Sequence, residues 1–125
     1  MAARLDLLQV AGARILVVED ESAIAGDTER SLKALGYRVS GRAGTGAGAI
    51  DQAVATSPDA VLIDLRLPGP LDGLGAAKEI QQRLRIPVVF LTASADEPTL
   101  RQVELPSPFG YVVKRSTIGT SRWRW

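Results

Sequence analysis

Polar side chains with metal-binding or phosphate-binding chemistry follow several short apolar runs of the sequence. They are three acids, one hydroxyl and one ammonium group: Glu19, Asp20, Asp64, Thr92 and Lys114. Three carboxylates brought close together repel one another unless a cation lies among them. The chain has no cysteine and no histidine, so its metal ligands must be oxygens, which favours Mg²⁺, with Mn²⁺ as a substitute. The same composition excludes thiol nucleophiles, Ser/His/Asp triads and histidine-ligated metals.

Phosphoryl transfer is the chemistry that this set of side chains favours. A carboxylate can attack phosphorus and form an aspartyl phosphate, while a metal ion and an ammonium group neutralise the phosphoryl oxygens. Asp64 is the candidate nucleophile because it stands alone after an apolar run. The adjacent acids Glu19 and Asp20 are then the metal ligands, and Thr92 and Lys114 bind phosphoryl oxygens.

Five short runs of mostly aliphatic residues predict the strands that position these side chains. They cover residues 15–18, 37–39, 60–63, 88–91 and 111–113. Three of them are apolar throughout, as strands covered on both faces must be, whereas the run at 37–39 is partly polar and is expected at an edge. Because the carboxyl ends of parallel strands share one edge of a sheet, the polar residues that follow the runs are expected to converge there.

Apolar residues recur at helical spacing between these runs. The positions expected to face the core, in three successive helices, are Ile24, Thr28, Leu32 and Leu35; Ala47, Ile50 and Val54; and Leu74, Ala77, Ile80 and Leu84. Gly36 is the expected C-cap of the first helix. A fourth helix is expected to begin near residue 96 and to end before Pro106. The alternation of strand and helix predicts a doubly wound parallel α/β sheet with right-handed crossovers.

Length and charge exclude further classes. With 125 residues the chain fits one compact domain. The net charge of +1 hides an asymmetry, since residues 115–125 hold three arginines and no acid, which leaves twelve basic against fourteen acidic residues in 1–114. This slight excess of acidic residues in 1–114 argues against a domain that binds nucleic acid. The sequence has no signal-peptide core and no apolar run long enough to span a membrane, so we expect a cytoplasmic protein with no membrane partner.

Four segments resemble the receiver domain of two-component response regulators. Residues 15–21 read Ile-Leu-Val-Val-Glu-Asp-Glu, and residues 61–68 read Val-Leu-Ile-Asp-Leu-Arg-Leu-Pro with Asp72-Gly73 following. Residues 88–93 read Val-Val-Phe-Leu-Thr-Ala, and residues 109–114 read Phe-Gly-Tyr-Val-Val-Lys. The resemblance covers residues 14–114, and it implies a flavodoxin-like five-stranded sheet of order 2-1-3-4-5.

The resemblance also implies residue roles. Asp64 would accept a phosphoryl group from a histidine kinase or histidine phosphotransfer protein, in a signalling domain that is not an enzyme toward other substrates. Mg²⁺ would be held by Asp20, Asp64 and the backbone carbonyl of Arg66, with Glu19 acting through water. Thr92 and Tyr111 would form the conformational switch, and Lys114 would bind the phosphoryl group.

Two other functions and a set of purely structural roles compete with this interpretation. Gly44, Gly46 and Ala49 fit the G-x-G-x-x-A dinucleotide fingerprint, and Asp64 lies twenty positions after Gly44. The preceding run at 37–39 is polar, however, whereas the strand before a dinucleotide loop is expected to be central and apolar. A second alternative is a receiver-like scaffold without signalling. Taken singly, Glu19 or Asp20 could simply cap the next helix.

The segment after Lys114 departs from the family. Arg115 stands where the family usually has proline after the lysine, so we expect a trans peptide bond here. Residues 115–125 are poor helix sequence, with Gly119 and four hydroxyl residues, so the fifth helix is expected to be short or missing. The chain is therefore divided into an N-terminal extension (1–13), a receiver domain (14–114) and an atypical basic, tryptophan-containing tail (115–125). Trp123 and Trp125 are expected to bury against the region of Tyr111 or against a second copy, giving a homodimer through the fourth helix, fifth strand and tail.

Overall fold

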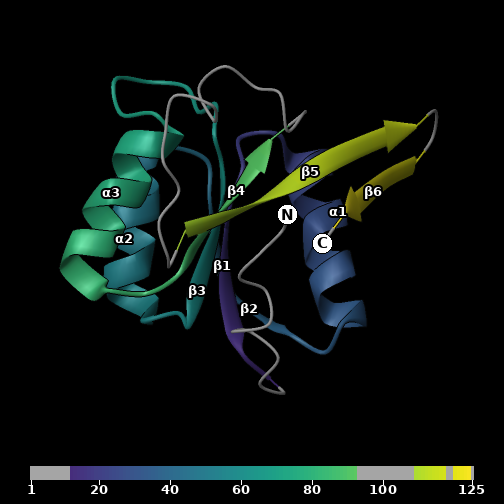
Figure 1. The fold of residues 1–125 in the computed structure, drawn as a ribbon, viewed down its shortest axis with the longest axis horizontal. Coiled ribbons are helices and arrows are strands. Elements are labelled where there is room, and N and C mark those ends of the chain that lie inside the picture. The colour runs from purple at the N-terminus through teal and green to yellow at the C-terminus, as the bar shows by residue number, and fades with distance from the viewer. Residues whose placement is uncertain (1–11, 93–108, 118–119, 125) are drawn as a thin grey trace.

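The computed structural model describes residues 12–92, 109–117 and 120–124, with side chains described for 12–91. Three helices and six strands lie within these residues (Figure 1). In chain order they are β1 (Arg14–Val18), α1 (Ser22–Ala34), β2 (Arg38–Ala43), α2 (Gly46–Thr56), β3 (Ala60–Asp64), α3 (Gly73–Leu84), β4 (Val88–Thr92), β5 (Phe109–Thr117) and β6 (Thr120–Arg124). The fourth helix expected between residues 96 and 106 lies outside the described residues. None of the described helices has the length and apolar character needed to cross a membrane.

The strands form one sheet in the order β2-β1-β3-β4-β5-β6. The first five strands pair in parallel, which confirms the predicted order 2-1-3-4-5 and the edge position of β2. The sixth strand, which the sequence analysis missed, runs antiparallel to β5. Each parallel connection whose helix is described carries that helix across one face of the sheet, as β-α-β units require.

The tail is a strand and not a helix. Residues 120–124 pair with residues 113–117, so β5 continues beyond Lys114 and returns as β6 after only two residues. Threonine and tryptophan favour extended backbone, whereas the same composition is poor for a helix. β6 lies beside α1 (Figure 1), on the side of the molecule where a fifth helix was in question. The side chain of Trp123 and all of Trp125 lie outside the described residues.

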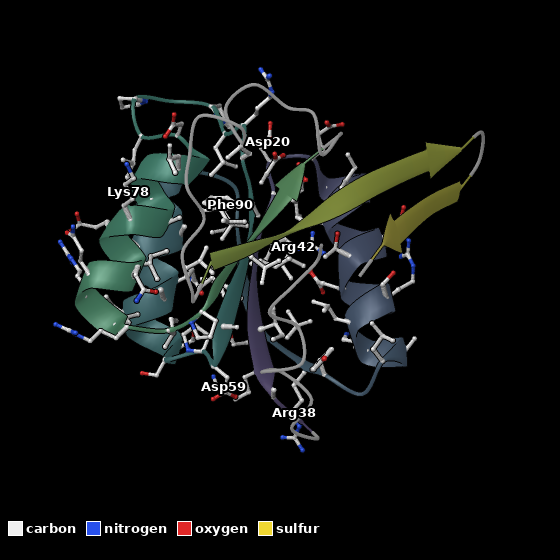
Figure 2. All side chains as sticks on the ribbon, viewed as in Figure 1. Asp20, Arg38, Arg42, Asp59, Lys78 and Phe90 are labelled. Atoms are coloured by element: carbon white, nitrogen blue, oxygen red, sulfur yellow. The ribbon has the colours of Figure 1, made fainter. Side chains whose placement is uncertain are left out.

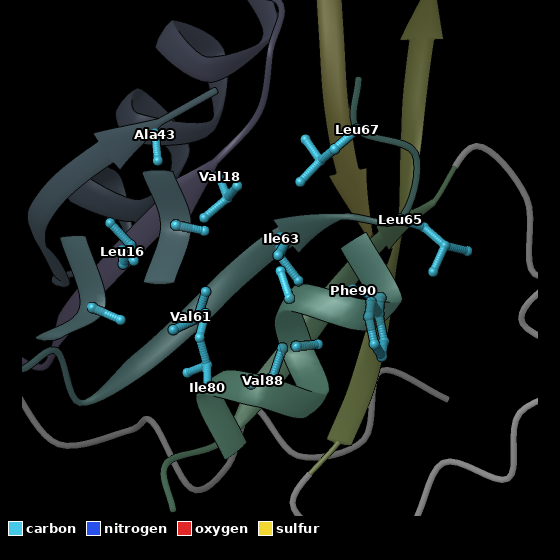
Figure 3. Close-up of a cluster of buried hydrophobic side chains, with 14 residues drawn as sticks. Leu16, Val18, Ala43, Val61, Ile63, Leu65, Leu67, Ile80, Val88 and Phe90 are labelled. Atoms are coloured by element: carbon cyan, nitrogen blue, oxygen red, sulfur yellow. The ribbon is translucent and has the colours of Figure 1, made fainter. Parts of the chain in front are cut away.

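The core has two layers, one on each face of the sheet. On one face, α2 and α3 cover alternate residues of the strands, including Leu16, Val18, Val61, Ile63 and Phe90 (Figure 3). On the other face, α1 contributes Ala25 and Leu32 to a cluster with the intervening strand residues, which are Ile15, Val17, Ala60, Leu62, Val89 and Leu91. Burial of both faces explains why β1, β3 and β4 are continuous apolar runs.

The predicted buried faces are right for α3, largely right for α1 and only partly right for α2, where Ile50 packs against the core but Ala47 and Val54 are exposed. Thr28 and Leu32 of α1 are buried, whereas Leu35 is the C-cap residue and is 54% exposed. In α2 the buried residues are Gly46, Ala49 and Ala53, and Val54 is 53% exposed. The small side chains of Gly46, Ala49 and Ala53 allow α2 to pack closely on the sheet. The observed buried face therefore lies one residue before the predicted face of Ala47, Ile50 and Val54.

Side-chain caps start two of the three helices. The Thr45 hydroxyl accepts a hydrogen bond from the Gly48 N–H at the start of α2, and Asp72 accepts from the Gly75 N–H at 2.8 Å at the start of α3. The N-cap of α1 is Glu21, whose side chain makes no capping hydrogen bond. The alternative that Glu19 or Asp20 caps this helix is therefore wrong, because both residues precede its N-cap.

Gly46 marks a close contact between α2 and the loop before α3. A Cβ atom at this position would lie 2.4 Å from the carbonyl oxygen of Leu71. We expect Gly46→Ala to lower the free energy of unfolding by about 2 kcal/mol, because backbone must move to admit the methyl group. Urea unfolding measures this change.

Gly26→Ala is the matched control for that experiment. Gly26 lies within α1, where a Cβ atom would meet only the side chain of Arg30, at 3.6 Å. Alanine is the better helix former, so this variant should gain about 0.5–1 kcal/mol. Equal effects of the two substitutions would contradict the close-packing argument.

Candidate metal and phosphoryl site

Three carboxylates gather at the carboxyl edge of the sheet. Glu19 and Asp20 follow β1, and Asp64 ends the neighbouring strand β3, where Val18 pairs with Ile63. One carboxylate oxygen from each residue lies within 4.8 Å of the other two. Figure 2 shows Asp20 at the opposite end of the sheet from Asp59, which precedes β3. The structure therefore brings together the three acids that the sequence analysis singled out.

Two of these acids are buried and one is exposed. Glu19 and Asp64 are only 2% and 7% exposed, whereas Asp20 faces solvent. A buried carboxylate is stable only when hydrogen bonds or a positive charge compensate it. Glu19 Oε2 accepts a hydrogen bond from the Glu21 N–H at 3.3 Å, and Asp64 Oδ1 accepts from the Arg66 N–H at 3.0 Å. These bonds orient each carboxylate against the backbone that immediately follows it.

The backbone beneath the site is fixed by close packing. A Cβ atom on Gly73 would lie 2.0 Å from the carbonyl oxygen of Asp64 and 2.8 Å from that of Leu65. Only glycine fits this approach, so the start of α3 braces the end of β3. The Asp72-Gly73 pair was part of the family resemblance, but sequence reasoning missed the bracing contact. The signal that could have suggested it is a capping aspartate followed at once by glycine, which places the helix start close to another segment.

The donor set fits a hard divalent cation. All three acids offer oxygen, and Mg²⁺ is bound in proteins by one or two carboxylates together with waters. In an octahedral shell with bonds of about 2.1 Å, adjacent ligands lie about 3.0 Å apart and opposite ligands about 4.2 Å apart, so oxygens within 4.8 Å of one another are near enough for one ion to lie among them. The exposed position of Asp20 leaves one side of the cluster toward solvent, where waters or a phosphoryl group could complete the shell.

Backbone register places Thr92 and Lys114 near the same edge, and Tyr111 further inside the sheet. Asp64 pairs with Leu91, and Thr92 at the end of β4 pairs with Val113 of β5, directly before Lys114. Tyr111 lies two residues earlier on β5, opposite Phe90. The side chains of Thr92, Tyr111 and Lys114 lie outside the described residues, so their predicted roles toward a phosphoryl group stay predictions.

Packing and capping account for the glycine-rich segment 44–49. Gly46 admits the Leu71 carbonyl, and the Thr45 hydroxyl caps α2. The strand before this segment, β2, is an edge strand paired with β1 alone among the described strands. Asp64, the candidate ribose contact, instead belongs to the carboxylate cluster. These features remove the support for a dinucleotide site at Gly44, Gly46 and Ala49.

The chain matches the protein family described as the response regulator receiver domain over residues 15–120. Among curated proteins it is similar to the transcriptional regulatory protein PdtaR of Mycobacterium tuberculosis, with 34% identity over 105 residues. That alignment covers 84% of this chain and 51% of PdtaR. The chain thus spans about half the length of the curated relatives it matches.

Solved structures of receiver domains have the same fold. The receiver domain of a modulated diguanylate cyclase from Desulfovibrio desulfuricans G20, described as an example of alternate folding, aligns with a TM-score of 0.74 and 33% identity, covering 85% of this chain and 84% of that one. The receiver domain of the sensor histidine kinase PA1611 from Pseudomonas aeruginosa aligns with a TM-score of 0.70 and 34% identity, covering 86% and 88%. Its structure has a magnesium ion coordinated in the active site cleft.

The carboxylate cluster generates a test of metal binding. Asp20→Asn should weaken Mg²⁺ binding by at least about tenfold, because the substitution removes an anionic ligand and site charge while keeping the side-chain shape. Isothermal titration calorimetry measures the affinity. The control is Asp51→Asn, which removes one exposed carboxylate on α2. If Asp20→Asn bound Mg²⁺ as tightly as the parent protein, the assignment of Asp20 as a ligand would be wrong.

Proposed function

Since the chain belongs to the response regulator receiver domain family, we propose that it is a phosphorylation-controlled switch in which Asp64 accepts a phosphoryl group from a histidine kinase or histidine phosphotransfer protein. The single observation that carries the proposal is the cluster of Glu19, Asp20 and Asp64 carboxylates at the carboxyl edge of the sheet. A receiver scaffold without signalling would need neither buried carboxylate, and burying them has a cost.

The proposed residue roles are those that the family resemblance implies, and the carboxylate cluster is compatible with them. Asp20, Asp64 and the Arg66 carbonyl would hold Mg²⁺, and Glu19 would act through water. The bound ion supplies positive charge that neutralises the phosphoryl oxygens and the carboxylates. An Asp64 oxygen attacks phosphorus, a new O–P bond forms, and the P–N bond to the donor histidine breaks.

The switch in this proposal uses residues of β4 and β5. The Thr92 hydroxyl and the Lys114 ammonium bind the new phosphoryl oxygens, and the Tyr111 ring turns inward to fill the space that Thr92 vacates. The backbone is compatible with this assignment, because Thr92 ends β4 and pairs with Val113, the residue before Lys114, while Asp64 ends the neighbouring strand β3. Phosphorylation then acts as a local charge change that biases a two-state element.

Incubation with acetyl phosphate and Mg²⁺ tests the phospho-acceptor. Intact mass spectrometry should show one phosphoryl adduct on the parent protein and none on Asp64→Asn, because the amide is not a nucleophile toward phosphorus. Asp51→Asn should keep the adduct, and so should Gly44→Ala, which alters the glycine-rich segment. A parent protein that forms no adduct while binding Mg²⁺ would favour the scaffold alternative.

Lys114→Ala separates metal binding from switching. The ammonium group matters only after phosphoryl oxygens arrive, so the variant should bind Mg²⁺ within about twofold of the parent. The chemical-shift response of Tyr111 to phosphorylation should be largely lost. Saturating the variant with acetyl phosphate and confirming the adduct by mass ensures that the spectra compare phosphorylated proteins. A full Tyr111 response in that variant would refute the role of Lys114.

A further inference from the structure

The hairpin formed by β5 and β6 extends past the parallel sheet. β4 pairs with β5 over residues 109–113, whereas β6 pairs with β5 over residues 113–117. The second half of β5 and the whole of β6 therefore continue beyond the carboxyl end of β4, as the two yellow arrows in Figure 1 show. This places a two-stranded ribbon at the same end of the molecule as the carboxylate cluster.

The pairing register collects arginines on one face of this ribbon. Arg115 lies directly across from Arg122, and Arg124 is two residues further along β6, opposite Val113. Alternate residues of a strand lie on the same face, so all three arginine positions share one side of the ribbon. Residues 109–124 contain no acid. Like charges directly opposite each other destabilise a strand pair, and an anionic ligand on this face would relieve the repulsion.

The outer edge of β6 supplies a second, independent recognition element. Within the described part of the chain, β6 pairs with β5 and with no other strand. An edge strand presents backbone N–H and C=O groups that another extended chain can bind as an added strand. A second copy of this chain is a poor candidate, because pairing β6 with β6 would bring Arg122 and Arg124 of both copies together.

We propose that the β5–β6 ribbon docks an acidic, extended segment of a partner protein, which pairs with the outer edge of β6 and sets its carboxylates against the face of Arg115, Arg122 and Arg124. A peptide satisfies both the backbone edge and the arginine face. Nucleic acid offers no strand backbone, and its phosphates would approach the end of the sheet that holds Glu19, Asp20 and Asp64.

The test uses the full chain and labelled peptides of about ten residues, the length of a typical strand with short flanks. One probe alternates Glu and Val, a second alternates Glu and Pro, and a third alternates Lys and Val. Fluorescence anisotropy at low ionic strength should show binding of the Glu-Val peptide and about tenfold weaker or no binding of the other two. The Glu-Pro peptide has equal charge, but its prolines fix φ at about −65°, which disfavours the extended strand conformation, and they remove every N–H from one of its two edges. An oligothymidine of about twenty nucleotides serves as the nucleic-acid probe and should bind less tightly than Glu-Val.

Matched variants locate the binding surface. The double variant Arg122→Gln/Arg124→Gln should weaken Glu-Val binding by about tenfold. The control Lys33→Gln/Lys78→Gln removes the same charge from exposed positions of α1 and α3 and should stay within about twofold. Circular dichroism checks that each variant folds. Should the arginine variant fail to fold, the comparison of Glu-Val with Glu-Pro on the parent chain still decides the question.

Several outcomes would overturn the proposal. Equal affinity for the Glu-Val and Glu-Pro peptides would show that charge alone binds them, without strand pairing. Unchanged binding in the arginine variant would place the site elsewhere. Tighter binding of oligothymidine would indicate a nucleic-acid surface, and a dimer of the parent chain in light scattering that the arginine variant strengthens would assign the edge to self-association. Absence of any peptide binding would refute it outright.

Discussion

Two buried carboxylates of like charge, Glu19 and Asp64, at the ends of adjacent parallel strands are the constraint on which the rest of the structure depends. Their separation follows from the pairing of β1 with β3, so the protein cannot move them apart without breaking its central ladder. Such a pair repels when both carboxylates are charged, and the Glu21 and Arg66 N–H groups donate hydrogen bonds to them. A cation bound between the carboxylates would lower this repulsion. The same geometry that is costly without an ion is therefore suited to bind one.

Close backbone packing keeps this costly arrangement in place. α3 begins at Gly73, against the carbonyl of Asp64, and α2 begins at Gly46, against the carbonyl of Leu71. Each contact ties a helix start to the loops at the carboxyl edge, where the site lies. The packing of α2 through Ala49 and Ala53 has the same character, since small side chains bring its backbone close to the strands. Close packing at this edge therefore depends on glycine and alanine, whose small size lets backbone segments approach one another, as much as on large apolar side chains.

The sequence predicted the features that depend on local pattern and on general rules of parallel sheets. Continuous apolar runs identified β1, β3 and β4, the polar run identified the edge strand β2, and convergence of strand ends placed Glu19, Asp20 and Asp64 together. It failed where tertiary contact decides. Helical spacing assigned the buried face of α2 to Ala47, Ile50 and Val54, whereas the fully buried residues are Gly46, Ala49 and Ala53, and Ile50 packs only partly buried against the core. The contact of Gly73 with the carbonyl of Asp64 was missed because it joins two different elements. The sixth strand was missed because the tail was assessed only for its propensity to form a helix.

The continuation of β5 gives a physical reason for the residue after Lys114. Proline is disfavoured inside a paired strand, because it has no N–H to donate and is largely confined to edges, strand starts and bulges. Arg115 pairs across from Arg122 instead, so the strand runs on to Thr117 and can fold back as β6. Lys114 then lies between two constraints, with its preceding residue paired to β4 and the lysine itself paired to Trp123. The departure from the family at position 115 is thus compatible with the departure in the tail, because a strand that continues through this position favours a residue other than proline.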